Sequence, residues 1–462
     1  MAGVTGSRQT DSAARGIRAR AVAIAWPASI EYIVITGIMF ADTIFISRVG
    51  TPQIAGVSIA FTLIFTFAAV FNSVAVASTT VVAQAKGAGN LDLVRTGAAQ
   101  SILLASLLGV AVGAAGFWAS RLAMELMGTE GEAARAGSTY VSTVLLSSPL
   151  YAAALAGGGV MRGVGDTRTP MIFTLIGNST KIALSAVLIF GLLGFPAMGV
   201  RGGALATVVG YSLNALLVMS KLFRGFDGAR LNHAGLYRPR PGLLRRIFAL
   251  SMPIAVEQLV MRMGFLFYMR VVSALGTVAL AANAMAMRLE SVALTLGFGF
   301  TVAATTLVGQ SVGRGDYDSA EVNANATTQL AVITMATMAA ILLVMRTHAL
   351  EIFKPEPAVY APAMTCLTIA AFELVPLGFV FTYAGALRGA GDTLSPMVVS
   401  FVGTLAFRLP LVYLFALIFD LGLPGIWYGT LMDWIGRAVV MYVIFRRGKW
   451  KAMAFVKESE RG

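Results

Sequence analysis

The chain contains the same short motif twice, and this repetition constrains its fold more than any other feature. RGVGDTRTPM at 162–171 returns as RGAGDTLSPM at 388–397, a displacement of 226 residues (388 minus 162). The same displacement carries Pro27 and Glu31 onto Pro253 and Glu257. It also relates Gly50-Thr51, Gln84, Gly199, Gly203 and Gly210 to Gly276-Thr277, Gln310, Gly425, Gly429 and Gly436. A register kept along most of the chain indicates a duplicated unit, so the two halves should share one architecture.

The composition restricts that architecture to a membrane protein. A soluble chain of this length would carry about a quarter charged residues. Here only 12% of the 462 residues are charged, 57% are hydrophobic, and the mean hydropathy is +0.78. Apolar runs of the roughly 20 residues needed to cross a bilayer recur along the whole length. The spans should be helices, because a span in lipid must satisfy its own backbone hydrogen bonds, and the short alternating segments of a barrel are missing from the sequence.

The apolar runs predict an all-α fold of twelve spans, six in each half. Those of the first half cover 18–47, 53–85, 93–118, 134–160, 169–190 and 199–221, and those of the second cover 244–273, 279–311, 319–344, 360–387, 395–419 and 425–446. The polar stretch 222–243 is rich in Gly, Pro and Arg, as linkers are. We therefore expect an N-terminal lobe over 1–226 and a C-terminal lobe over 227–462 that begins with a linker to about residue 243.

The placement of Lys and Arg predicts the orientation. If the N-terminus is cytoplasmic, most basic residues lie on the inside, and the outside loops contain only Arg48, Arg121, Arg135, Arg201, Arg346 and Lys354. Both termini should then be cytoplasmic, and six spans per half make the repeat parallel rather than inverted. The net charge of +13 thus mainly reflects basic residues on the cytoplasmic side, where they can contact anionic lipid. It does not predict nucleic-acid binding.

A few further classes are disfavoured by single residue types. One cysteine excludes a disulfide within the chain, and two histidines disfavour a histidine-rich metal site. Residues 1–20 are polar and basic and contain no cleavable signal. We expect a multi-pass protein of the bacterial inner membrane that needs no bound metal or organic cofactor.

The repeated motif itself predicts a turn between the fourth and fifth spans of each half. Thr169-Pro170 and Ser395-Pro396 resemble a cap residue followed by proline at the first helical position. The glycines before them permit a tight turn. Direct contact with a substrate is the alternative. The motif is no phosphate loop, because the lysine of that motif is missing.

Ionisable residues inside the predicted spans are the candidate functional residues. Each costs at least about 2.5–3.5 kcal/mol at the bilayer centre unless it finds a partner or water. The acidic ones are Glu31, Asp42, Glu257, Glu290, Glu373 and Asp433, and the basic ones are Lys181, Arg262, Arg270, Arg288, Arg408 and Arg437. The equal numbers indicate pairing. Arg288 and Glu290 are two residues apart and should face different ways, whereas Asp433 and Arg437 are four apart and can pair within one helix.

Two sets of these residues differ in how the repeat treats them. Glu31 and Glu257 each follow a span proline, Pro27 or Pro253, by four residues, so each pair is a candidate gate hinge or a packing device. Asp42 and Lys181 are not duplicated, because the repeat places Tyr268 and Phe407 at their positions. Duplicated features serve the scaffold, so the unduplicated charges are the better candidates for chemistry.

Several stretches together resemble the MATE family of multidrug and toxin extrusion transporters. They are Pro27, TGIMFADTIFISRVG, the two RGxGDTxxPM motifs and the closing IWYGTLMDWIGRAVVMYVIFRRGKW. The resemblance covers nearly the whole chain. It implies two six-helix bundles forming a V around a central cavity, and exchange of inward Na⁺ or H⁺ for outward organic, often cationic, small molecules. It implies transport rather than catalysis, by a protein that we expect to be a monomer.

The resemblance also suggests roles for individual residues. Asp42 matches the first-span aspartate that the family uses for cation coupling, Pro27 matches the proline at which that helix bends, and Thr207 resembles the sixth-span threonine beside the same site. Where many relatives have an asparagine and, four residues later, an aspartate, this chain has Lys181 and Ser185. The second-half acidic pair of another branch has no clear match in Glu257 or Glu373.

The lysine changes the expected coupling ion. A Na⁺ site needs several oxygen ligands, and an ammonium four residues from Ser185 repels the ion. We hypothesise proton coupling through Asp42, with Lys181 as a built-in counter-cation that protonation of Asp42 releases. Na⁺ coupling and a static Asp42–Lys181 strut remain alternatives.

Three other functions compete with drug export. A lipid-linked oligosaccharide flippase of the same wider superfamily would use a cationic cavity, for which Arg262, Arg270, Lys181 and Arg408 are candidates. A membrane enzyme is disfavoured, because no metalloprotease motif, nucleophile elbow or histidine cluster is present. A sensor or scaffold fits the repeat less well than alternating access by two rocking halves does.

Overall fold

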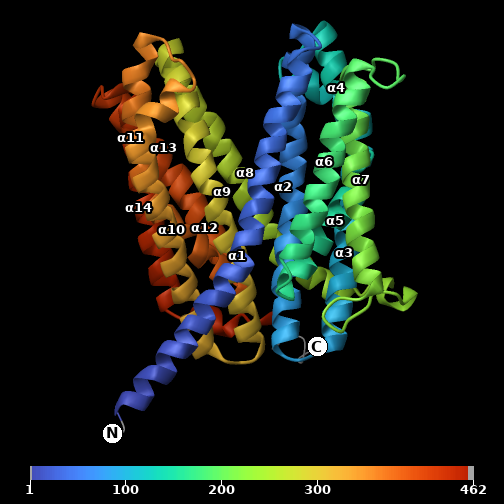
Figure 1. Cartoon of the computed structure of the whole chain (residues 1–462), viewed down its shortest axis with the longest axis vertical. Helices are drawn as coiled ribbons and strands as arrows, with labels where there is room; N and C mark the ends of the chain where they lie inside the picture. The colour runs from blue at the N-terminus through green and yellow to red at the C-terminus, as the bar shows by residue number, and fades with distance from the viewer. Residues whose placement is uncertain (1–2, 456–462) are drawn as a thin grey trace. The chain divides into compact units, whose positions relative to one another are not determined.

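The computed structural model describes residues 3–455, and that part of the chain is helical apart from turns and one isolated bridge between Phe226 and Ala229. The first half contains α1 (Gly3–Ser47), α2 (Thr51–Gly87), α3 (Leu91–Leu126), α4 (Gly131–Leu145), α5 (Ser148–Gly163), α6 (Arg168–Phe190) and α7 (Val200–Arg224). The second contains α8 (Pro241–Ala274), α9 (Thr277–Gly313), α10 (Tyr317–Glu351), α11 (Pro357–Ala390), α12 (Leu394–Val402), α13 (Leu409–Tyr413) and α14 (Gly422–Arg446). Figure 1 shows these helices as long rods joined by short connections.

Ten of the described helices are long and apolar enough to cross a membrane, or eleven if α4 and α5 are counted as one span. These two helices are bent by 55° relative to each other, so the single span expected over 134–160 is broken. The break lies just before Pro149, which stands in the first turn of α5, where proline fits a helix start. α14 falls outside the apolar set because Asp433 and Arg437 lower its hydropathy.

The predicted span over 395–419 is continuous but irregular. α12 and α13 are joined by a π-helical stretch (Gly403–Arg408), and a second one (Leu414–Ile418) follows α13. Such wide turns are rare and often occur near functional residues. Arg408 lies at the end of the first π-helical stretch.

The chain forms two compact units whose boundaries fall inside two helices. One unit, called the N-unit, comprises Glu31–Ala255, and the other, called the C-unit, comprises Val256 onward together with the chain up to Ile30. α1 therefore passes from the C-unit to the N-unit directly before Glu31. α8 passes from the N-unit to the C-unit two residues before Glu257.

Within the N-unit, α6 packs along α7, and α2 packs against α3 and α5 (Figure 1). The linker after α7 is docked on α3. Gln100 donates to the carbonyls of Leu236 and Arg238 at 2.8 and 2.9 Å, and the backbone N–H of Arg240 donates to Gln100 Oε1 at 3.0 Å. The expected linker is thus an ordered part of this unit.

Within the C-unit, α11 packs against α9, α10 and α14. The first part of α1 belongs to the same core, where Ala21 and Ala25 are buried with Phe300 and Ala303 of α9. The hydroxyl of Ser29 donates to the carbonyl of Leu296 at 3.1 Å. This packing holds residues 21–29 of α1, just before Glu31.

The repeated motif forms a turn in each half, but its capping residue is not the expected one. α6 begins at Arg168, and Asp166 accepts hydrogen bonds from the backbone N–H and the hydroxyl of Thr169 at 3.0 and 2.6 Å. Asp392 likewise accepts hydrogen bonds from the backbone N–H and the hydroxyl of Ser395, at 2.9 and 2.7 Å. The prediction that Thr169 and Ser395 cap these helices was wrong: they lie inside the first turn, and the aspartate carboxylate satisfies the free N–H.

Candidate functional site

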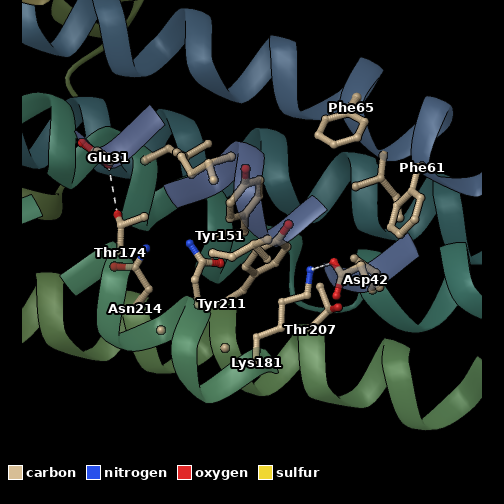
Figure 2. Close-up of a pocket in the computed structure, with 18 of the residues that line it drawn as sticks. Glu31, Asp42, Phe61, Phe65, Tyr151, Thr174, Lys181, Thr207, Tyr211 and Asn214 are labelled. Atoms are coloured by element: carbon tan, nitrogen blue, oxygen red, sulfur yellow. Dashed lines mark hydrogen bonds and ion pairs between the residues drawn. The ribbon is translucent and has the colours of Figure 1, made fainter. Parts of the chain in front are cut away.

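The N-unit encloses a cavity of about 180 Å³ into which most of the predicted coupling residues project (Figure 2). Its polar and aromatic lining comprises Glu31, Asp42, Phe61, Phe65, Tyr140, Tyr151, Thr174, Asn178, Lys181, Thr207, Tyr211 and Asn214. On α1, Glu31, Ile35, Ile38 and Asp42 recur at intervals of three or four residues and so share one helix face. The same spacing relates the lining residues of α6 and of α7.

Lys181 of α6 and Asp42 of α1 form a buried ion pair at one end of this cavity. Lys181 Nζ contacts Asp42 Oδ2, and the two side chains are 7% and 6% exposed (Figure 2). Asp42 lies eleven residues beyond Glu31, or about 16 Å along α1, whereas Lys181 lies seven beyond Thr174, or about 10 Å along α6. The four-carbon stem of the lysine covers the remaining distance.

Close packing of α6 and α7 holds the lysine in place. A Cβ added to Gly210 would lie 2.8 Å from the carbonyl oxygen of Gly177 and 2.8 Å from Lys181 Cβ. Only glycine permits this approach. Thr207, one turn earlier on α7, donates to the carbonyl of Gly203 and shares a 3.2 Å hydrogen bond with the hydroxyl of Tyr140.

Glu31 closes the other end of the cavity with partners from two helices. Arg162 Nη1 of α5 lies 3.0 Å from Glu31 Oε2, and the hydroxyl of Thr174 on α6 donates to Glu31 Oε1 at 3.0 Å. Arg162 is the first residue of the repeated motif. That motif therefore supplies a charge partner to α1 as well as a turn.

The C-unit contains the same arrangement at the equivalent positions. Arg388 Nη2 lies 2.6 Å from Glu257 Oε2, and the hydroxyl of Ser400 donates to Glu257 Oε1 at 2.8 Å. Both arginines are 131 residues after their glutamates. The sequence prediction missed these partners, although the shared spacing of two buried acids and two motif arginines was a signal that could have identified them.

Four of the other predicted charges of the C-unit, Glu373, Arg408, Asp433 and Arg437, lie on or beside α14. Asp433 accepts from Arg408 at 2.8 Å and pairs with Arg437 at 2.7 Å, as predicted for the latter. Trp434 stacks with both guanidinium groups at 4.5 and 4.9 Å. Glu373 accepts a hydrogen bond from the hydroxyl of Thr430. This cluster is an ion network rather than a single pair.

Other predicted residues lie apart from the cavity. Ser185 is buried one turn beyond Lys181 and does not line the cavity. Glu290 is buried on α9 and Arg288, two residues earlier, is exposed, so the two face different ways as predicted. Arg262 is exposed on α8. Pro27 and Pro253 lie inside α1 and α8. Tyr140, Tyr151, Tyr211, Asn178 and Asn214 were not predicted, although their helical spacing from Lys181 and Thr207 places several of them on the same faces.

No group of three or more His, Cys, Asp or Glu side chains lies close enough to hold a metal ion in the described part of the chain. The arrangement can hold a charged pair next to a polar and aromatic cavity in a protein of many apolar helices. Those features favour a polytopic membrane transporter.

Comparison with known proteins identifies the family. The MatE family model matches residues 27–187 and 253–414, one stretch in each half. The probable multidrug resistance protein NorM of Thermotoga maritima is 30% identical over 438 residues, which cover 95% of this chain and 94% of that protein. The multidrug resistance protein MdtK of Edwardsiella ictaluri is 28% identical, covering 92% and 94%. The chain belongs to the MATE family of multidrug efflux transporters.

Solved structures show the same fold. An outward-facing multidrug resistance MATE family transporter of the MOP superfamily has a TM-score of 0.88 at 22% identity, with 95% of this chain and 96% of that chain covered. A MOP superfamily transporter from Pyrococcus furiosus, described as having a binding pocket of reverse polarity, has a TM-score of 0.87 at 22% identity, covering 95% and 96%.

Proposed function

We propose that this protein is a secondary active antiporter that exports organic, often cationic, compounds from the cytoplasm in exchange for protons. The observation that carries the proposal is the buried Asp42–Lys181 ion pair beside the cavity of the N-unit. A neutral pair in low dielectric is stable, whereas protonation of Asp42 leaves an uncompensated ammonium. Proton binding therefore changes the charge of the cavity by one unit.

That change of charge gives a physical route to exchange. With Asp42 ionised, the pair is neutral, and a cationic compound can lie among Tyr151, Tyr211 and the phenylalanines, whose ring faces attract cations. When Asp42 takes a proton from outside, the freed Lys181 repels the compound and favours its release. Loss of the proton to the inside restores the pair.

The proposal favours H⁺ over Na⁺ because of the donors around Asp42. A Na⁺ ion needs several oxygen ligands, but the nearest partner of the carboxylate is an ammonium group. Na⁺ would have to displace Lys181 Nζ. Ser185, which lies outside the cavity lining, would contribute no ligand there.

The topology proposed for this function has twelve spans and cytoplasmic termini in the bacterial inner membrane. α14, at 25 residues, is long enough to be the additional span. The two lobes, residues 1–226 and 227–462, would open alternately to the two sides of the membrane. We propose that the protein works as a monomer and binds no nucleic acid. α1 and α8 pass between compact units next to Glu31 and Glu257, so we propose bending at Pro27 and Pro253 for this motion.

Export of a cationic dye such as ethidium from proteoliposomes tests the proposal, with a proton gradient and a Na⁺ gradient imposed separately. We expect the proton gradient to drive export and Asp42→Asn to abolish it. Tyr268→Phe is the matched control, because Tyr268 occupies the equivalent position of the C-unit and the substitution removes one hydroxyl.

Each other result has a defined meaning. Export driven only by Na⁺ would reject proton coupling. Export that survives both Asp42→Asn and Lys181→Ala would make the ion pair a static strut. If neither gradient drives dye export but lipid-linked sugars cross the bilayer, the flippase alternative replaces this one.

A further inference from the structure

We propose that Glu31 is a second proton carrier of the transport cycle, reached from Asp42 through water in the cavity of the N-unit. This inference rests on the proposed proton-coupled export and adds a residue to it. Its starting observation is that one cavity has an acid at each end, Asp42 and Glu31 (Figure 2). Each acid pairs with a cation from another helix, Lys181 or Arg162.

The cavity is large and polar enough to hold water between the two acids. One water needs about 10–15 Å³ of such space, and the cavity has about 180 Å³. Asn178, Tyr151, Tyr211 and Asn214 line it between the ends, and Asn214 Oδ1 is buried without a protein partner among the described residues. Buried acceptors of this kind are normally satisfied by water.

The groups around each acid support opposite roles. Arg162 and Tyr151 of α5 and Thr174 of α6 surround Glu31. Lys181 of α6, with Tyr140 and Tyr211 nearby, surrounds Asp42. Arginine cannot give up its proton, so the cation at Glu31 is permanent, whereas lysine can. A proton that reaches Glu31 therefore meets the fixed charge of Arg162, which favours passing the proton on over keeping it.

The proposed transfer moves one proton from Asp42 to Glu31. The O–H bond of protonated Asp42 breaks, its carboxylate pairs again with Lys181, and a chain of waters delivers one proton to Glu31. Glu31 then releases that proton to bulk water on the side of Arg162, which the proposed topology makes cytoplasmic. One proton crosses, and no electron is transferred.

The C-unit supplies the internal comparison. Glu257 has the same arginine and hydroxyl partners, but Tyr268 replaces Asp42 and Phe407 replaces Lys181. The acid near that end of the C-unit is Asp433, at the position of Thr207, and two arginines hold it instead of one lysine. If the Glu–Arg pair served only to hold a helix, the two copies would respond equally to substitution.

The experiment compares Glu31→Gln with Glu257→Gln in proteoliposomes that report dye export and interior pH together. Each variant leaves one arginine without its carboxylate, so the structural cost is matched. We expect Glu31→Gln to slow proton-driven export at least about tenfold more than Glu257→Gln. Equal slowing in the two variants would overturn the proposal.

The double variant Glu31→Gln/Arg162→Gln separates proton transfer from neutralisation of charge. Removing both partners of a buried pair is often tolerated, whereas removing one is not. We expect the double variant to stay as slow as Glu31→Gln, and restored export would show that Glu31 only neutralises Arg162. If Glu31→Gln does not fold, Thr174→Val against Ser400→Ala repeats the test with all charges kept. A wild-type protein without proton-driven export would instead reject the proposed function itself.

Discussion

The N-unit and the C-unit each contain the same Glu–Arg ion pair, Glu31–Arg162 or Glu257–Arg388, but their other buried charges differ. In the N-unit one lysine meets one aspartate beside a cavity. In the C-unit two arginines converge on Asp433, and both guanidinium groups stack on Trp434. The repeat relates Thr207 to Asp433 (207 plus 226). The acid of the N-unit, Asp42, therefore lies on the first helix of its half, whereas the corresponding acid of the C-unit, Asp433, lies on the last.

The two units differ in which cation can lose its proton. Lysine is a flexible point charge whose proton can leave when it is buried, whereas arginine keeps its charge and binds carboxylates in a fixed fork. The Asp42–Lys181 pair can therefore open and close. In the Arg408–Asp433–Arg437 network both cations keep their charge, which suits a support against which another part of the protein moves.

The largest expected effect separates the two acids by stability. Asp433→Asn leaves two buried arginines without their acceptor and should destabilise the protein by about 3–5 kcal/mol. Asp42→Asn should cost clearly less, because it leaves only one cation without its acceptor and Lys181 lies beside a cavity large enough for water. The unfolding midpoints of both variants in one detergent measure this, and equal losses would contradict the distinction.

The second effect exchanges the cations. Lys181→Arg puts a permanent charge beside Asp42. If the arginine stabilises the ionised carboxylate of Asp42 by about 1.4 kcal/mol more than the lysine does, proton-driven export should fall about tenfold at neutral pH, because Asp42 then binds a proton less readily. A more acidic outside should restore it, because protonation of Asp42 then becomes favourable again. Arg408→Lys is the reciprocal control and should leave the pH profile of export unchanged. A shifted profile in Arg408→Lys would assign coupling to the C-unit as well.

Much of this arrangement could be predicted from the sequence because the repeat and the cost of buried charge are strong constraints. They predicted the helical spans, the turn motifs, the Asp433–Arg437 pair and the candidates Asp42 and Lys181. The bend before Pro149 could not be predicted, since apolar content continues across it. The partners of Glu31 and Glu257 were missed because Arg162 and Arg388 lie in a motif whose glycines and proline already had an explanation as a turn.

The third effect tests the helix contact that holds Lys181. Gly210→Ala adds a Cβ 2.8 Å from the Gly177 carbonyl and from Lys181 Cβ, and such overpacking costs about 1–3 kcal/mol. Gly436 is the repeat equivalent, and a Cβ there meets nothing within 4 Å. Gly436→Ala should be neutral or stabilising by at most about 1 kcal/mol, since alanine favours the helix. The unfolding midpoint should therefore fall for Gly210→Ala and stay or rise for Gly436→Ala. Equal midpoints would show that the close approach of α6 and α7 does not position the lysine.

The smallest effect uses a pair of helix caps that differ only in whether they titrate. Asn90 caps α3 by accepting from the N–H of Leu93 at 2.9 Å, and Asp316, its repeat equivalent, caps α10 by accepting from the N–H of Ser319 at 2.9 Å. Hydrogen bonds from the side chain and backbone of Ser319 lower the pKa of Asp316. A pKa lowered by folding stabilises the protein above the unfolded value, about 3.9, and that stabilisation is lost as the pH falls through the folded pKa.

The cap substitutions should therefore exchange a pH dependence between the halves. The difference in unfolding midpoint between wild type and Asp316→Asn should shrink as the pH falls from neutral to about 3, because only the wild-type cap loses its ionised form. Asn90→Asp should acquire the same dependence in the other half, since its carboxylate would accept the equivalent N–H. Other titrating groups cancel in each difference, so a midpoint difference that stays constant with pH would show that the ionised cap contributes nothing that a neutral amide does not.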